Sequence, residues 1–451
     1  MPRPTNLDSS STALSAFARL RGAGSLVVAL AFGVVVRVAE AQRLPQADPE
    51  RAGFSTAALG ALHDTLQQLV ADGTIPGAAL LIARGGRIVD VTTVGYADRE
   101  TRTAVQRNSI FRLASATKIW VSAAVLTLVD DGRIGLDDSL GRYLPEFASM
   151  RVYSDSGSTR PAGRAITVRD LLRHTAGTGY GYADPYQAAL IERGLMTVGG
   201  RFARDWSHPW TLAEWTRRLA AIPLENEPGT AFGYGLSHDI LGRVVEAVSG
   251  QRLDEFVKRR ILDPLGLRDT GFSVDTASRG RLTSFYIVEN GRLVRTETGL
   301  ESPFRDAPRA PSGGGGWDQL GNGGMVTTVD DFARFLLMLL NRGELNRVRI
   351  LSRAAVAEML TNQLSGIGSG DSYWPGAGFG YGYAVLYDDV KYDGPGRTGK
   401  IWWAGSTNVY FWMDRELELI GVFMTHLVPF GHADVMGRVE RLTYGAIADH
   451  R

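Results

Sequence analysis

Residues 119–129 form a run that would be apolar on nearly every face of a helix. Helices of this kind are buried on all sides rather than lying at a surface. Ser115 and Lys118 stand just before it. Because residues three apart share a helix face, a hydroxyl and an amine are expected to project together from the amino end of a buried helix.

The position of Lys118 predicts an unusual amine. The amino end of a helix carries partial positive charge and burial penalises an ammonium ion, so both effects lower the pKa of this lysine from about 10.4. A neutral amine can accept the proton of the Ser115 hydroxyl and turn the serine into a nucleophile. The alternative is that Ser115 only caps the helix, but a capping box has Glu or Gln three residues later, where this chain has Lys118.

Tyr234 lies at a loop-to-helix junction after the turn-rich residues 227–230. A phenol placed there can face a cleft, and near a cationic lysine its pKa is expected to fall below about 10 so that the pair shares the serine proton. Taken alone, Tyr234 fits a buried aromatic as well. The neighbouring Ser237, His238 and Asp239 cannot form a triad, because adjacent residues cannot face one another in the required geometry.

A second candidate element is Trp403-Ala404-Gly405-Ser406, at the start of a late strand hairpin. The edge of a strand beside a serine nucleophile can offer a backbone N–H to a developing oxyanion. Small residues there let a substrate approach closely. A glycine-marked bend in a strand is the alternative interpretation.

The chain has 451 residues, a net charge of +1 and no cysteine. The charge balance shows no footprint of nucleic-acid binding, so a small neutral or weakly charged molecule is the expected partner. The missing cysteine excludes disulfides, thiolate metal sites and a cysteine nucleophile. His426, His432 and Asp434 are one cluster worth testing as a metal site, but neither a metal nor a cofactor is expected.

Residues 1–41 have the pattern of an export signal, with an apolar stretch at 22–36 and a small-x-small cleavage motif at 39–41. The apolar stretch is shorter than the roughly 20 residues of a membrane span. We expect a periplasmic or secreted mature protein that begins near Gln42 and is not inserted in a membrane. An uncleaved anchor is the alternative, because Arg37 directly follows the apolar core.

The remaining pattern predicts one sheet assembled from both ends of the chain, with helices between them. The segments expected at the two ends are a helix at 55–72, strands at 78–83, 87–94, 409–413 and 417–425, and a helix at 433–448. The helical pieces expected between them are 167–174, 212–221, 238–249, 253–261 and 329–340.

These segments indicate an α/β (α+β) fold, in which an antiparallel sheet flanked by helices carries a mostly helical inserted subdomain. Residues 42–451 are expected to be a single catalytic domain. Its α/β part would be about 48–112 and 343–449, and its helical part about 113–342.

The motifs together resemble the serine β-lactamase and penicillin-binding protein superfamily, and more narrowly the family VIII carboxylesterases, whose fold resembles that of class C β-lactamases. The resemblance runs from about Arg51 to Asp449. Besides Ser115, Lys118 and Tyr234, the segments that carry it are 171–177, 323–328, 410–412 and 421–425.

Two departures from class C β-lactamases bear on the substrate. Leu236 stands where those enzymes have Asn, and Trp403-Ala404-Gly405 stands where they have Lys-Thr-Gly. The missing lysine removes a cationic partner for the β-lactam carboxylate, and the missing amide removes a polar contact to the substrate side chain. Esterases of family VIII resemble this chain in carrying Trp-x-Gly, so Leu236, Trp403, Ala404 and Gly405 are expected to contact an ester.

The sequence therefore predicts a serine hydrolase that cleaves small carboxylic esters through an acyl-enzyme on Ser115, with room for weak β-lactam hydrolysis. Lys118 and Tyr234 are expected to accept the serine proton, and the N–H groups of Ser115 and Ser406 to form the oxyanion hole. One alternative is a class C-like β-lactamase or D,D-peptidase acting on β-lactams or cell-wall peptides. Another is a catalytically silent binding protein with the same fold.

Overall fold

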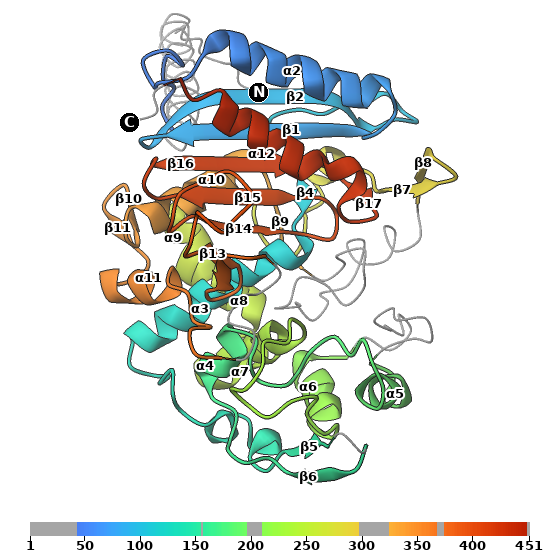
Figure 1. Ribbon diagram of the computed structural model, residues 1–451, viewed down its shortest axis with the longest axis vertical. Helices are drawn as coiled ribbons and strands as arrows, with labels where there is room; N and C mark the ends of the chain where they lie inside the picture. The colour runs from blue at the N-terminus through green and yellow to red at the C-terminus, as the bar shows by residue number, and fades with distance from the viewer. Residues whose placement is uncertain (1–42, 155–156, 196–209, 297–323, 368–373, 449–451) are drawn as a thin grey trace, which may run out of the picture. The chain divides into compact units, whose positions relative to one another are not determined.

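Both ends of the chain contribute strands to one antiparallel sheet, as the sequence predicts (Figure 1). The computed structural model describes residues 43–154, 157–195, 210–296, 324–367 and 374–448, and within them this sheet has eight strands in the order β12-β13-β14-β15-β16-β1-β2-β3. The strands are β1 (Gly77–Arg84), β2 (Arg87–Asp98), β3 (Thr103–Ala104), β12 (Ala377–Phe379), β13 (Ala384–Leu386), β14 (Ile401–Ala404), β15 (Tyr410–Asp414) and β16 (Leu419–Met424). The predicted α/β fold is therefore confirmed.

Pro45–Arg451 is one compact unit. The predicted export signal falls in the other unit, Met1–Leu44, and residues 1–42 lie outside the described part of the chain. Among the described helices, none combines the length and the apolar composition that a membrane crossing requires. The export signal and the boundaries of the α/β and helical parts stay predictions.

The hairpin of β1 and β2 has a two-residue turn, Gly85-Gly86, with φ of +58° and +72°. A tight hairpin turn of this kind needs positive φ at both central residues, which glycine adopts without steric cost. The other edge of β1 pairs with β16, where Ile82 lies opposite Gly421. The first and last strands predicted from the sequence are thus neighbours at the centre of the sheet.

Helices cover both faces of the sheet, and the alternation of side chains along β15 shows which helix covers which face. Phe411 packs against Phe332 of α10 (Val329–Leu340), with ring centroids 5.0 Å apart. Tyr410, on the opposite face, donates a hydrogen bond to Glu440. Glu440 belongs to α12 (Val435–Gly445), which lies beside α2 (Thr56–Ala71) in Figure 1.

The apolar run predicted to be a buried helix is α3 (Lys118–Asp130), and its residues 118–128 are all buried. Trp120 stacks on Phe335 of α10 with ring centroids 3.7 Å apart. The helix therefore lies between the sheet layer and the helical part of the chain. Its amino end opens into a 3₁₀ turn, Ala114–Thr117, that carries Ser115.

The predicted helices are present, with ends that differ from the prediction by a few residues. The remaining helices are α4 (Val168–Leu172), α5 (Tyr186–Glu192), α6 (Leu212–Ala220), α7 (Ser237–Ser249), α8 (Leu253–Val257), α9 (Asp263–Leu265) and α11 (Arg353–Met359). The short strands outside the large sheet are β4 (Phe111–Arg112), β5 (Arg151–Tyr153), β6 (Thr159–Pro161), β7 (Tyr286–Glu289), β8 (Arg292–Arg295), β9 (Val326–Thr327), β10 (Glu344–Leu345), β11 (Val348–Arg349) and β17 (Leu427–Val428).

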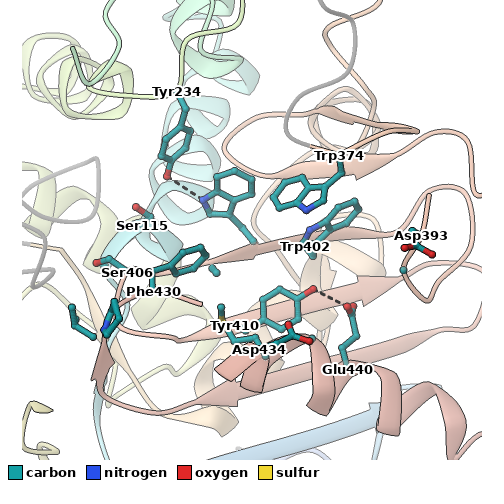
Figure 2. Close-up of a pocket in the computed structure, with 18 of the residues that line it drawn as sticks. Ser115, Tyr234, Trp374, Asp393, Trp402, Ser406, Tyr410, Phe430, Asp434 and Glu440 are labelled. Atoms are coloured by element: carbon teal, nitrogen blue, oxygen red, sulfur yellow. Dashed lines mark hydrogen bonds between the residues drawn. The ribbon is translucent and has the colours of Figure 1, made fainter. Parts of the chain in front are cut away.

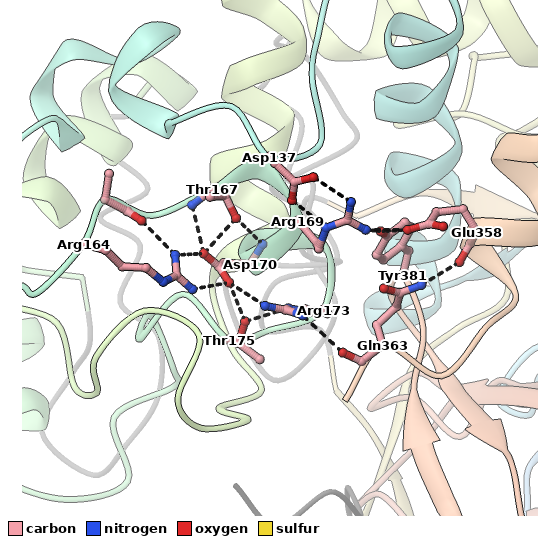
Figure 3. A network of polar contacts seen from close by, with 11 residues as sticks. Asp137, Arg164, Thr167, Arg169, Asp170, Arg173, Thr175, Glu358, Gln363 and Tyr381 are labelled. Carbon is pink, nitrogen blue, oxygen red and sulfur yellow. Dashed lines mark hydrogen bonds and ion pairs between the residues drawn. The ribbon is translucent and has the colours of Figure 1, made fainter. Parts of the chain in front are cut away.

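A buried carboxylate, Asp170, organises the loops around α4 (Figure 3). Arg164 and Arg173 donate to its two oxygens at 2.6 and 3.0 Å, and the hydroxyls of Thr167 and Thr175 donate at 2.8 and 2.9 Å. Burial alone would raise the pKa of this carboxyl, but the hydrogen bonds from Arg164, Thr167 and Arg173 outweigh it and lower the pKa to about 2. Asp170 therefore fixes the start of the segment that leads to His174.

We expect Asp170→Asn to lower the free energy of unfolding by about 2 kcal/mol, because it removes the buried carboxylate to which Arg164, Arg173 and the two threonine hydroxyls donate. The folded pKa lies below the usual Asp value of 3.8, so the contribution of the carboxylate is present above about pH 4 and is lost as the pH falls toward 2. Urea unfolding of both proteins at several pH values measures this, and the gap between them should narrow only in that acidic range.

The matched control for this prediction is Asp137→Asn in the same network. Asp137 pairs with Arg169, but its side chain is 74% exposed, and exposed ion pairs contribute about 0–1 kcal/mol. Equal stabilities of the wild type and Asp170→Asn at neutral pH would show that Asp170 does not hold these loops.

Candidate active site

Ser115 and Lys118 lie together, as their spacing predicts. Lys118 is fully buried, and its Nζ is 3.2 Å from the Oγ of Ser115. Ser115 is partly exposed and lines a cavity of about 1110 Å³ (Figure 2). Burial lowers the pKa of Lys118 to about 7, while the negative charge of Asp239 acts in the opposite direction. The amine is thus available as a proton acceptor near neutral pH, for the reason that the sequence suggested.

Ser115 does not cap α3. The N-cap position is Thr117, and its hydroxyl accepts a hydrogen bond from the Met325 backbone rather than from the helix. Ser115 belongs to the preceding 3₁₀ turn, and Ala114 just before it has a φ of +46°. L residues rarely adopt this backbone conformation, and it recurs at functional sites where the surrounding structure holds it in place.

Tyr234 faces Ser115 and Lys118 from the loop before α7. The indole N–H of Trp403 donates to its hydroxyl at 3.0 Å, and Lys118 Nζ lies 4.7 Å from the centre of its ring. The predicted fall in the pKa of this phenol is wrong. Burial raises the pKa of Tyr234, against hydrogen bonds with Ser115, Trp403 and Tyr180 that lower it.

Tyr180 is a second phenol at the site, and the sequence analysis missed it. Its hydroxyl lies 3.4 Å from Lys118 Nζ, and its ring is 5.4 Å from that of Tyr234. Burial raises its pKa well above the usual value for tyrosine. Its signal in the sequence is weak, because a tyrosine between Gly179 and Gly181 has no periodic pattern around it.

Two buried histidines lie behind Lys118 and Tyr234. His174 packs on Tyr234 with ring centroids 4.6 Å apart, and its Nδ1 accepts a hydrogen bond from the Gly235 backbone at 3.2 Å. His238 lies 2.9 Å from the Ser122 hydroxyl through its Nε2. Burial holds the pKa of both imidazoles well below the usual range. They therefore add no positive charge beside Lys118.

The contacts of His238 also show whether Ser237, His238 and Asp239 form a triad. The Ser237 hydroxyl pairs with Thr178 at 3.0 Å, whereas His238 contacts Ser122. Ser237, His238 and Asp239 therefore do not form a triad, as expected for adjacent residues.

The Trp403–Ser406 segment meets the serine turn at the end of β14. A side chain on Gly405 would place its Cβ 2.3 Å from the Leu113 carbonyl oxygen, so only glycine permits this approach. Trp403, Ala404 and Ser406 line the same cavity as Ser115. Gly405 acts through backbone packing and is outside the lining.

Leu236 does not contact the cavity among the described residues. It is 4% exposed, and its backbone N–H donates to Thr178 at 2.9 Å. The residue therefore packs under the loop that carries Tyr234, which differs from its predicted contact with substrate.

The sequence model of the Beta-lactamase family matches residues 62–444. The chain belongs to this family. It is 33% identical to Esterase EstB of Burkholderia gladioli over 84% of this chain and 93% of that protein, and 30% identical to Protein Rv1367c of Mycobacterium tuberculosis over 81% and 89%. The solved structure of "EstCE1, a hydrolase with promiscuous acyltransferase activity" superposes with a TM-score of 0.71 at 29% identity, covering 87% of this chain and 99% of that one. The protein is thus a hydrolase with the serine β-lactamase fold.

His426, one of the candidate metal ligands, is a structural residue of this β-lactamase-type fold. It is buried, its Nε2 accepts a hydrogen bond from the Arg112 backbone at 2.6 Å, and its Nδ1 lies 2.5 Å from the Thr283 hydroxyl. In the part of the chain that the structure describes, no three His, Asp or Glu side chains are grouped to hold a metal ion.

The low pKa of Lys118 predicts how the reactivity of Ser115 depends on pH. We expect the rate of covalent labelling by a fluorophosphonate probe to fall as the pH drops through about 7, because the ammonium form of Lys118 cannot accept the serine proton. Lys118→Met should abolish labelling. Lys258→Met, at an exposed lysine, is the control and should leave the profile unchanged. A labelling rate that stays constant between about pH 5 and 9 would contradict the assignment.

The Trp403 N–H predicts a separate effect on Tyr234. Trp403→Phe keeps most of the ring but removes the hydrogen bond to the phenol, which is worth about 1–1.5 kcal/mol, so we expect the labelling rate to fall about tenfold. Trp412→Phe is the matched control, because the Trp412 indole is buried and its N–H has no partner in the described structure. Equal labelling rates for the two variants would show that the Trp403 hydrogen bond does not contribute to the reactivity of Ser115.

Proposed function

We propose that the protein is a carboxylesterase that forms an acyl-enzyme on Ser115. The observation that carries the proposal is the 3.2 Å approach of a fully buried lysine amine to a serine hydroxyl that opens into a cavity. A buried amine with a pKa of about 7 can take the serine proton without a metal or a histidine. The reaction then needs only an acyl group presented to that oxygen.

In the proposed reaction, Lys118 accepts the Ser115 proton as Oγ attacks the carbonyl carbon of the ester. The N–H groups of Ser115 and Ser406 stabilise the negative charge on the carbonyl oxygen, and losing one such donor typically costs about 10² to 10³ in rate. The intermediate collapses, and the leaving alcohol takes the proton held by Lys118. Water then attacks the acyl-enzyme, releases the carboxylic acid and restores Ser115.

The two phenols have a different role from the one that the sequence suggested. Burial raises the pKa of Tyr234 and Tyr180, so both keep their protons near neutral pH. We assign Tyr234 as a hydrogen-bond donor that passes the proton between Lys118 and the alcohol oxygen. Trp403 orients it, because the indole N–H donates a hydrogen bond to the Tyr234 hydroxyl.

The charges around the cavity favour esters over β-lactams. Asp393, Asp434 and Glu440 line it, and the sole lysine or arginine among the described lining residues is Arg441, which pairs with Asp434. A β-lactam carries a carboxylate, and the only cation that the described lining offers it is Arg441, whose charge Asp434 already balances. The similarity to Esterase EstB and EstCE1 also supports an ester substrate. A β-lactamase or D,D-peptidase remains the second candidate, supported by the family itself.

We expect the wild type to hydrolyse p-nitrophenyl butyrate and to turn over nitrocefin at a kcat/KM at least about a hundredfold lower. Ser115→Ala should lose ester hydrolysis by about 10⁴-fold or more, because no other hydroxyl replaces the nucleophile. Retained esterase activity in Ser115→Ala would refute the acyl-enzyme. A nitrocefin rate equal to or above the ester rate would favour the second candidate.

A further inference from the structure

The cavity that Ser115 lines is larger than a short ester requires. Its volume of about 1110 Å³ lies just above the roughly 300–1,000 Å³ of pockets that hold drug-sized ligands. From Ser115 it continues past Trp403 to residues 392–395 and to α12. Neither the proton transfer nor the oxyanion hole uses this far part.

Three rings line the far part of the cavity, and we call Trp374, Trp402 and Tyr392 the aromatic arm. Trp402 contacts Trp374 at 5.5 Å and Tyr392 at 5.1 Å between ring centroids. Figure 2 shows Trp374 and Trp402 on the side of the cavity toward Asp393, away from Ser115 and Ser406. Aromatic pairs at these separations offer flat faces and edges against which another ring can pack.

A buried ammonium lies behind the aromatic arm. Lys400 is fully buried and outside the cavity lining, and its Nζ lies 4.9 Å from the centre of the Trp402 ring and 5.2 Å from that of Tyr392. It also pairs with Glu440 at 2.6 Å and donates to the Pro395 carbonyl at 2.6 Å. A cation on one side of an aromatic ring attracts the π electrons toward itself. The ring face that lies toward the cavity then attracts a second cation less strongly.

The carboxylates that line the cavity near the aromatic arm are paired with other side chains or exposed to solvent. Glu440 accepts a hydrogen bond from Tyr410 at 3.0 Å and pairs with Lys400, and Asp434 pairs with Arg441. Asp393 is exposed to solvent, where its charge is screened. The chemistry of the arm is therefore that of polarised aromatic faces rather than of a cation trap.

We propose that the aromatic arm is a stacking subsite for a flat, uncharged ring carried by the substrate. The inference rests on the proposed function, because it takes the ester at Ser115 as the other end of the same molecule. It narrows the substrate class from small esters to esters whose acyl or alcohol part bears an extended ring system.

The first test measures hydrolysis by wild type, Trp374→Ala and Tyr392→Ala. The probes are p-nitrophenyl butyrate, p-nitrophenyl 3-(2-naphthyl)propanoate and 2-naphthyl butyrate, so that a naphthyl ring sits in the acyl or in the alcohol part. We expect each variant to lower kcat/KM for at least one naphthyl ester about tenfold more than for p-nitrophenyl butyrate. Each ester is compared between variant and wild type, so differences in the chemical reactivity of the esters cancel. Tyr387→Ala, at a partly exposed tyrosine outside the cavity lining, is the matched control and should change all three equally.

The second test is independent of catalysis. Calorimetry compares the binding of 2-naphthalenemethanol and of 2-naphthylmethyl-trimethylammonium, which share the ring and differ in charge. We expect the neutral alcohol to bind at least about fivefold more tightly, and Trp374→Ala to weaken it about tenfold. Tighter binding of the ammonium ion, or neutral binding that Trp374→Ala leaves unchanged, would overturn the subsite.

Different results would contradict the aromatic subsite and the proposed esterase function. If p-nitrophenyl butyrate is hydrolysed and Ser115 is labelled, but both variants affect all three esters equally, the aromatic arm is wrong and the esterase stands. If no ester is hydrolysed and Ser115 is not labelled, the proposed function is wrong, and the binding comparison alone decides the subsite.

Discussion

The burial of one amine, that of Lys118, is the constraint on which the site depends. Near neutral pH a solvated lysine is an ammonium ion and cannot accept a proton. Here the α3 helix is buried over residues 118–128, so the amine loses its hydration and its pKa falls to about 7. The same burial raises the pKa of Tyr180 and Tyr234. One dry environment therefore favours a neutral amine at Lys118 and protonated phenols at Tyr180 and Tyr234.

Contacts from the surrounding fold hold the residues of the site in position. Gly405 lets the end of β14 approach the Ser115 turn, and Trp403 reaches from the same strand to the Tyr234 hydroxyl. His174 packs against the Tyr234 ring. Its backbone φ is +59°, and the neighbouring Thr175 is held by a hydrogen bond to Asp170. A sheet edge, a helix end and a loop meet at Ser115, and each is fixed by contacts of its own.

The cavity adds selectivity to this reactive centre. Its lining contains aromatic and acidic residues, and Lys400 is buried beside the Trp402 and Tyr392 rings, outside the lining. Among the described residues of the lining, the only lysine or arginine is Arg441, which pairs with Asp434, whereas several aromatic side chains line the cavity. In our proposal, the reaction at Ser115 and the preference for a ring-bearing ester depend on largely different residues.

Much of this was determined by the sequence alone. The spacing of Ser115 and Lys118, the apolar run after them and the strands at both ends predict the nucleophile, the lowered pKa and the architecture, because they depend on local periodicity and on burial that the composition already implies. Tertiary structure decided the rest. Tyr180 and Trp374 come from irregular loops without a repeating pattern, and the pKa of Tyr234 rises because long-range packing removes water from it. Leu236 lies two residues after Tyr234 yet is buried outside the cavity lining, since the direction of a loop side chain is set by what packs against it.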